Sequence, residues 1–361
     1  MTRMKDRATA AAIGQAVLAA LLFGASAPLA KLLLGNVEPI PLAALLYLGS
    51  GLGMLPVYAL RRAAAPEHQA EAHIARADIP WLAGAVLAGG VAAPIVLLFS
   101  LRSTPAATAS LLLNFEGVAT TLIAALAFRE AIGRRVWIAI LCITGASILL
   151  SWQAGGAWGL SLGAVGILGA CALWGVDNNF TRNVSAKDPA TIVTVKGIAA
   201  GTFSLLLALL LGNSLPAAAG ALGGLLLGGV SYGLSIMLFV RAMRTLGAAR
   251  TSALFGVAPF AGALLSLALF RDAFSIPALL ALPLMAGGAF LLIGEDHSHR
   301  HTHDELEHDH LHSHDDQHHT HAHPGLSGAG AHAHLHQHAA LSHTHAHTPD
   351  IHHRHVHSDI D

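Results

Sequence analysis

The chain has few charged residues for its length. Charged side chains make up 11% of its 361 residues, whereas hydrophobic ones make up 54%. An ordinary soluble domain is about a quarter charged, so this composition excludes a soluble protein for the part that precedes position 295. The net charge is −1 and the basic residues are scattered between apolar runs, which argues against nucleic acid as a partner.

Cysteine and catalytic motifs are also scarce. The two cysteines, Cys142 and Cys171, lie inside apolar runs, where cysteine packs as a small hydrophobic residue rather than in a disulfide framework. The sequence contains no nucleophile–base constellation and no nucleotide-binding loop. We therefore expect a protein that is not an enzyme and that requires no cofactor.

Long apolar runs are abundant. A helix needs about 20 mainly apolar residues to cross the hydrocarbon of a bilayer, and these runs lack the period-two alternation of a membrane barrel. The sequence therefore predicts an all-α integral membrane protein with ten transmembrane helices in the lipid bilayer. The predicted spans are Ala10–Leu34, Pro41–Leu60, Ile79–Leu101, Pro105–Phe128, Val136–Trp152, Gly159–Phe180, Pro189–Gly212, Ala217–Val240, Gly247–Phe270 and Ile276–Ile293.

One stretch of the chain occurs twice. Ala106–Leu150 recurs as Ala248–Leu292 without a gap. Each copy joins two apolar spans through an aromatic, a basic and an acidic residue: Phe128-Arg129-Glu130 and Phe270-Arg271-Asp272. We predict two five-helix repeats, residues 1–152 and 153–294.

Basic residues concentrate in alternate loops and so predict the orientation. The loops on the other side carry only Lys31, Arg102 and Arg271. By the positive-inside rule both termini are expected in the cytoplasm, with the protein in a bacterial cytoplasmic (inner) membrane. Five spans in each half then make the two halves inverted relative to each other, an arrangement typical of secondary transporters.

These two halves resemble the EamA-type repeat of the drug/metabolite transporter superfamily, over about Ala10–Gly294. The shared pattern is small-small-x-x-Ser, an apolar run, Phe-Arg-acid, and a second apolar span with glycine. The resemblance implies an exporter of small organic metabolites or drugs that works by alternating access through a central cavity. The family commonly has a proline in the middle of the fourth span of a half. Pro259 matches it, whereas the first half has Gly117 there, preceded by Glu116.

Glu116 lies near the centre of the fourth predicted span. An ionisable group at that depth costs about 2.5–3.5 kcal/mol even on the lenient insertion scale, so the carboxyl must face a wet cavity, pair with a cation or stay protonated. We interpret Glu116 as a substrate-binding or proton-coupling carboxylate with Asn114 as a polar neighbour. The alternative is a structural bond to Lys196 or to helix backbone.

Three polar residues, Asp177, Asn178 and Asn179, follow one another near the end of the sixth span. Adjacent residues of a helix point to different faces, so one or two are expected to reach the cavity while the rest cap the cytoplasmic end. Lys196, in the seventh span, is expected to pair with Asp177 or Glu116. Binding a substrate carboxylate and reaching the cytoplasm are its alternatives.

Two prolines are predicted hinges. Pro28 and Pro259 each remove a helix hydrogen bond in an apolar span, and such breaks are tolerated beside a cavity. Trp174 lies near a predicted span end. We interpret it as an interfacial anchor rather than as a ring that stacks on a substrate.

The composition changes abruptly at Glu295. Of the 25 histidines, all except His68 and His73 follow it. Residues 295–361 are too polar and repetitive to form a core, and we predict a disordered cytoplasmic tail. Its imidazoles suit zinc, nickel, cobalt or copper. No fixed spacing selects a tetrahedral site. The candidate ligands are His297, His299, His301, His303, His308, His310, His312 and His314.

The tail supports a second hypothesis, a divalent-metal exporter whose tail collects or senses the metal. The predicted spans oppose it, because they contain no histidine and no acidic pair at ligand spacing. An exporter of small organic molecules, driven by protons or another coupling ion, is the leading hypothesis. The sequence specifies no oligomeric state.

Overall fold

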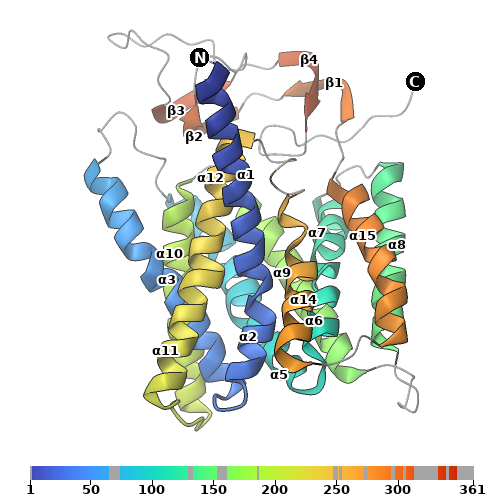
Figure 1. Cartoon of the computed structure of the whole chain (residues 1–361). Coiled ribbons are helices and arrows are strands. Elements are labelled where there is room, and N and C mark those ends of the chain that lie inside the picture. Colours follow the sequence, from blue (N-terminus) through green and yellow to red (C-terminus); the bar gives the residue numbers. More distant parts are fainter. Residues whose placement is uncertain are drawn as a thin grey trace.

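The computed structural model describes residues 2–64, 74–128, 133–152, 161–184, 187–246, 251, 254–271, 275–293, 297–303, 306–312, 332–338 and 341–347. Each predicted span contains a helix within these ranges. The helices run alongside one another as a bundle (Figure 1). In chain order they are α1 (Thr2–Gly24), α2 (Ser26–Leu33), α3 (Pro39–Ala64), η2 (Arg76–Asp78), α4 (Ile79–Ala85), η3 (Val86–Ala92), α5 (Ala93–Ser103), α6 (Ala106–Leu112), α7 (Phe115–Phe128), α8 (Arg134–Ser151), α9 (Leu162–Arg182), α10 (Pro189–Leu210), α11 (Ala218–Leu227), η4 (Gly228–Leu234), α12 (Ser235–Leu246), α14 (Ala258–Phe270) and α15 (Ile276–Ile293).

Within the described residues, seven helical stretches are long and apolar enough to cross a membrane. Two further apolar helices, α14 and α15, are shorter, and α9 has 21 residues. Many large apolar side chains, including Leu126, Leu162 and Leu210, are exposed. A lipid environment accounts for this exposure, because hydrocarbon solvates leucine as well as a protein core does. The protein is therefore an integral membrane protein.

Several spans are interrupted, and the interruptions follow from the backbone. Pro28 has no N–H to donate to Gly24, and the chain turns at Ala25 between α1 and α2. A turn at Leu113 and Asn114 likewise separates α6 from α7, and another turn precedes α14.

Two π-helices, η3 and η4, occupy corresponding places in the two halves. The start of η4 at position 228 lies 142 residues after the start of η3 at position 86 (228 − 86). The duplicated stretch has the same shift, from position 106 to position 248 (248 − 106). The correspondence between the halves therefore extends beyond the stretch in which it is visible in the sequence.

The two halves pack against each other along their length. Corresponding helices meet in the pairs α3–α10 and α8–α15, and the cross pairs α1–α12 and α5–α9 also correspond to each other. The fourth and ninth predicted spans, which correspond as well, meet through α6 and α14. The backbones also approach closely at the break between α1 and α2, where a Cβ on Gly24 would lie 2.2 Å from the carbonyl oxygen of Ala258. Glycine is required there to bring two broken helices into backbone contact.

The tail departs from the prediction. Antiparallel strands pair β1 (His297–His303) with β4 (Leu341–His347), and β2 (Leu306–His312) with β3 (His332–His338). The prediction of disorder is wrong for these strands, whereas the elements that the structure describes before position 295 are helices, as predicted. The physical reason is the alternating His-x-His pattern, whose period of two matches that of an extended strand. His314 lies outside the described residues. The strands lie at the end of the bundle where α1 begins (Figure 1).

Candidate functional site

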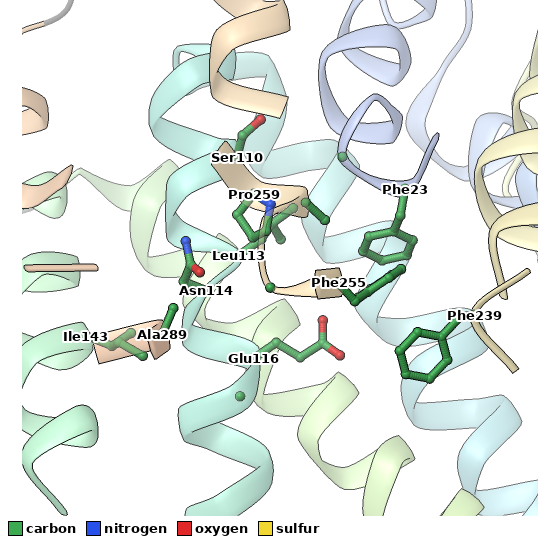
Figure 2. Close-up of a pocket in the computed structure, with 14 residues that line it drawn as sticks. Phe23, Ser110, Leu113, Asn114, Glu116, Ile143, Phe239, Phe255, Pro259 and Ala289 are labelled. Atoms are coloured by element: carbon green, nitrogen blue, oxygen red, sulfur yellow. The ribbon is translucent and has the colours of Figure 1, made fainter. Parts of the chain in front are cut away.

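Two cavities lie inside the bundle. Cavity I has a volume of about 290 Å³ and cavity II about 370 Å³. Cavity I lies at the breaks in the fourth span of each half (Figure 2). The first half lines it with Leu113, Asn114, Glu116 and Gly117, and the second half with Phe255, Gly256, Ala258 and Pro259.

These two sets of residues correspond one to one. A shift of 142 residues carries each member of the first set onto a member of the second, and it carries Glu116 onto Ala258 (116 + 142). Cavity I is thus built from the same segment of both halves, but only the first half contributes an acid. Pro259 lies in the first turn of α14 and lines the cavity, whereas Pro28 is buried in α2 beside the upstream break.

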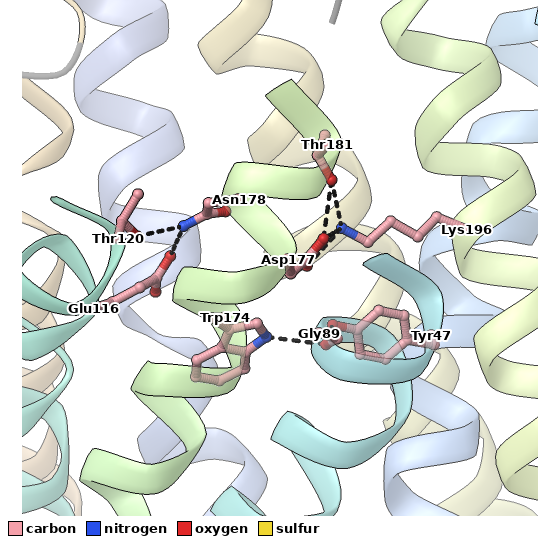
Figure 3. A network of polar contacts seen from close by, with 9 residues as sticks. All are labelled: Tyr47, Gly89, Glu116, Thr120, Trp174, Asp177, Asn178, Thr181 and Lys196. Carbon is pink, nitrogen blue, oxygen red and sulfur yellow. Dashed lines mark hydrogen bonds and ion pairs between the residues drawn. The ribbon is translucent and has the colours of Figure 1, made fainter. Parts of the chain in front are cut away.

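Glu116 lies in the first turn of α7 and lines both cavities. Asn178 Nδ2 donates to its Oε1 at 2.9 Å and also to Thr120 Oγ1 at 3.1 Å (Figure 3). Among the residues that the structure describes, Glu116 forms no ion pair. The start of α7 favours its negative charge, because the helix dipole is positive there.

Asn114, the predicted polar neighbour of Glu116, lines cavity I with it. Its amide donates to Leu111 O at 3.0 Å and lies 3.9 Å from Met285 Sδ. The break after α6 leaves the Leu111 carbonyl for this local side-chain bond. Figure 2 shows the Glu116 carboxylate turned away from Asn114 and towards Phe239 and Phe255.

Asp177 and Lys196 form an ion pair between α9 and α10. Lys196 Nζ lies 2.5 Å from Asp177 Oδ1 and 2.6 Å from Oδ2. Thr181 Oγ1 donates to Asp177 Oδ1 at 2.9 Å and accepts from Lys196 Nζ at 3.4 Å. The sequence left Asp177 and Glu116 open as partners for Lys196, and the structure selects Asp177. The pair lines cavity II as a unit without net charge.

A single glycine carbonyl beside this ion pair accepts hydrogen bonds from two aromatic side chains. Gly89, in η3, accepts from Tyr47 Oη at 2.5 Å and from Trp174 Nε1 at 3.0 Å (Figure 3). The π-helix frees this carbonyl from regular helix bonding. Trp174 is therefore buried and lines cavity II, so its interpretation as an interfacial anchor is wrong.

The two asparagines after Asp177 have different surroundings. Asn178 lines cavity II beside Glu116. Asn179 is buried, and its amide donates to Thr120 O at 3.0 Å and to Gly175 O at 2.8 Å. It fastens α9 to α7 rather than capping the end of the helix, which corrects the predicted capping role.

An aromatic cluster lines the cavities, and the sequence analysis missed it. Ring centroids are 5.4 Å apart for Phe23 and Phe255, 4.9 Å for Phe239 and Phe255, 5.8 Å for Phe23 and Tyr232, and 5.9 Å for Tyr47 and Tyr232. The rings come from four different spans, so no local motif joins them. The one available signal is that all of these rings except Phe239 lie away from the ends of their predicted spans, in a chain with only 6% aromatic residues.

Within the helices that the structure describes, no three His, Cys, Asp or Glu residues are grouped so as to hold a metal ion. The cavities present one unpaired carboxylate, one neutralised ion pair and several rings. This arrangement suits binding of a small molecule better than coordination of a metal.

This chain is similar in sequence and in fold to other proteins. An uncharacterized transporter of Methanothermobacter thermautotrophicus (strain Delta H) is 30% identical over 300 residues, which cover 76% of this chain and 84% of that protein. The crystal structure of another protein, 21% identical, has a TM-score of 0.56 and covers 78% of this chain and 96% of its own, which shows a shared fold. The EamA-like transporter family matches residues 10–152 and again 161–294. The chain therefore belongs to the EamA-like transporter family and is a membrane transporter.

Proposed function

We propose that the protein is a secondary transporter that exports small organic metabolites or drugs by alternating access. Cavity I carries this proposal, because corresponding segments of both halves line it at their helix breaks. Broken helices that meet between two repeats are where secondary transporters bind their substrates. Rocking of one half against the other then exposes the site to each side of the membrane in turn.

The architecture we propose is ten spans in two inverted five-helix repeats, residues 1–152 and 153–294, with residues 295–361 as an appendage. The constant shift of 142 residues (248 − 106) and the paired contacts between the halves support it. Both termini are proposed to be cytoplasmic, in a bacterial inner membrane, because the basic loops alternate with loops poor in basic residues.

In this proposal Glu116 binds either the substrate or the coupling ion, for which protons are the first candidate. Asn178 orients the carboxylate by its hydrogen bond of 2.9 Å. The Asp177–Lys196 pair fixes α9 against α10 on the opposite wall of cavity II. Pro28 and Pro259 are the proposed hinges, and Asn114 is a polar contact for substrate in cavity I.

The test is Glu116→Gln, which keeps the shape of the side chain and removes its charge. We expect loss of resistance in cells that express the protein and are challenged with a panel of amino-acid analogues and drugs, with unchanged amounts of protein in the membrane. Glu38→Gln is the matched control. This variant makes the same chemical change at a different place. Glu38 lies just before α3 and hydrogen-bonds to Asn213 outside both cavities. Full resistance in Glu116→Gln would remove this residue from the mechanism.

A divalent-metal exporter is the second candidate, favoured by the histidines that follow Glu295. The tail would collect or sense zinc, nickel, cobalt or copper with ligands drawn from His297 to His314. Metal salts belong in the same panel, with a variant that lacks residues 295–361. Resistance to a metal that depends on both Glu116 and the tail would favour this candidate. Resistance to an organic compound that survives loss of the tail would favour the first.

A further inference from the structure

Four residues line both cavities: Phe23, Glu116, Phe239 and Phe255. A molecule in either cavity therefore meets the same carboxylate and the same three rings. Two of the ring pairs, Phe23 with Phe255 and Phe239 with Phe255, are in contact. These four residues form the common wall of the two cavities.

The charges on this wall have one sign. The Lys196 ammonium lies between the two oxygens of Asp177, so the pair offers a ligand no net charge. The only hydrogen bond donor recorded for the Glu116 carboxylate within the described residues is the neutral amide of Asn178. A carboxylate held in the membrane without a cation is costly, and a ligand that carries the missing positive charge removes that cost.

The surrounding side chains select among cations. Metal ions such as Mg²⁺ and Ca²⁺ need several oxygen ligands, and Glu116 is the only carboxylate on the common wall. Aromatic faces attract organic ammonium groups and also accommodate their apolar parts. An anionic ligand is disfavoured because Lys196 is already paired.

From these contacts we infer that the substrate is an organic monocation with an apolar or aromatic part, whose charge binds between the Glu116 carboxylate and the rings of Phe23, Phe239 and Phe255. This inference rests on the proposed transport function and names the substrate class for the same site. Only the first half provides this carboxylate, because Ala258 stands at the corresponding position of the second half.

Binding of benzyltrimethylammonium to the purified full-length chain in detergent tests the inference. Its neutral isostere, in which carbon replaces the quaternary nitrogen, has the same shape without the charge. We expect the cation to bind at least about tenfold more tightly than the isostere, the ratio that corresponds to about 1.4 kcal/mol. Equal affinity for the two compounds, or no binding of the cation, would overturn the inference, and this comparison needs no variant.

Three variants locate the site. Glu116→Gln is expected to weaken binding of the cation by about tenfold or more without changing binding of the isostere, because a charge pair away from bulk water is strong. Phe255→Leu is expected to weaken it by about three- to tenfold through loss of the ring face. Glu38→Gln is expected to bind like the unmodified chain. Undiminished cation binding in Glu116→Gln would show that Glu116 does not bind the cation and would overturn the inference.

Failure of this inference is separable from failure of the proposed function. Transport of a neutral or anionic organic compound into vesicles that contain the protein, without measurable affinity for the ammonium, overturns the cationic substrate and leaves the exporter. Absence of transport for every class of organic compound counts against the exporter, whereas the binding ratio of cation to isostere still decides whether the cationic site exists.

Discussion

At the scale of the residue, position 89 has room for a hydrogen atom only. A Cβ built on Gly89 would lie 1.9 Å from Asp177 Oδ2, so any side chain there displaces the carboxylate that holds Lys196. Because the contact atom belongs to the buried side chain of Asp177, which Lys196 holds in an ion pair, the neighbour has little freedom to move away.

We therefore expect Gly89→Ala to destabilise the protein by about 1–3 kcal/mol, the usual cost of overpacking, and to lower its melting temperature in detergent. Gly169→Ala, in the same helix as Asp177, is the control. A Cβ at Gly169 meets nothing within 4 Å, and this change should be neutral or slightly stabilising. Similar melting temperatures for the two variants would show that Asp177 tolerates displacement.

The contacts of some site residues could be predicted from the sequence and those of others could not. Part of the difference lies in how far apart the partners are along the chain. Lys196 and Asp177 lie on consecutive helices, so their pairing could be anticipated as one of two choices. The hydrogen bonds of Asn114 and Trp174 could not be predicted, because a helix break and a π-helix expose backbone carbonyls that no residue pattern marks. The roles proposed for these residues in transport remain predictions.

At the scale of the element, the ion pair joins α9 to α10 within the membrane. Breaking one side of a buried pair leaves the other charge uncompensated, whereas replacing both sides removes the problem. Thr181, which bonds to both members, cannot substitute for the charge of Asp177.

Asp177→Asn is accordingly expected to destabilise the protein by on the order of 3 kcal/mol, and the double change Asp177→Asn with Lys196→Met to recover most of that loss. Thermal unfolding of the two single variants and the double variant in detergent gives the coupling energy. Additive losses would mean that the two charges are solvated independently, contrary to the contacts at 2.5 and 2.6 Å.

The sequence anticipated the apolar helices well, because length and hydropathy alone mark them. The breaks near Pro28 and Pro259 were also foreseeable, since proline lacks the donor that helix continuation requires. The π-helices η3 and η4 were not foreseen, because their small and apolar residues are equally compatible with a regular helix. In the tail, the alternation that suggests metal ligands also suits strands, and low hydrophobicity alone does not exclude paired strands.

At the scale of the whole molecule, the helical bundle and the tail make separate sets of contacts. The main packing partner of each tail strand is another tail strand, and the large contacts of the helices are with other helices. The duplication and the alternation of basic loops can be identified from the sequence alone. The aromatic cluster was not, because it forms only when four spans come together.

Deletion of residues 295–361 is therefore expected to leave membrane insertion, monodispersity and melting temperature unchanged. Size-exclusion chromatography and thermal unfolding of the truncated and full-length proteins in the same detergent check this expectation. A truncated chain that fails to insert, or that melts well below the full-length protein, would show that the tail supports the bundle.

The correspondence of Glu116 with Ala258 bears on the stoichiometry of transport, the number of cations carried in each turnover. A duplicated scaffold offers two equivalent places for an acid, and only one of them is filled. With a single carboxylate on the wall that both cavities share, two positive charges cannot be neutralised at once. If the proposed cation site is the transport site, each turnover is expected to carry one cation, with hyperbolic saturation, a Hill coefficient of one, and competition between two cations.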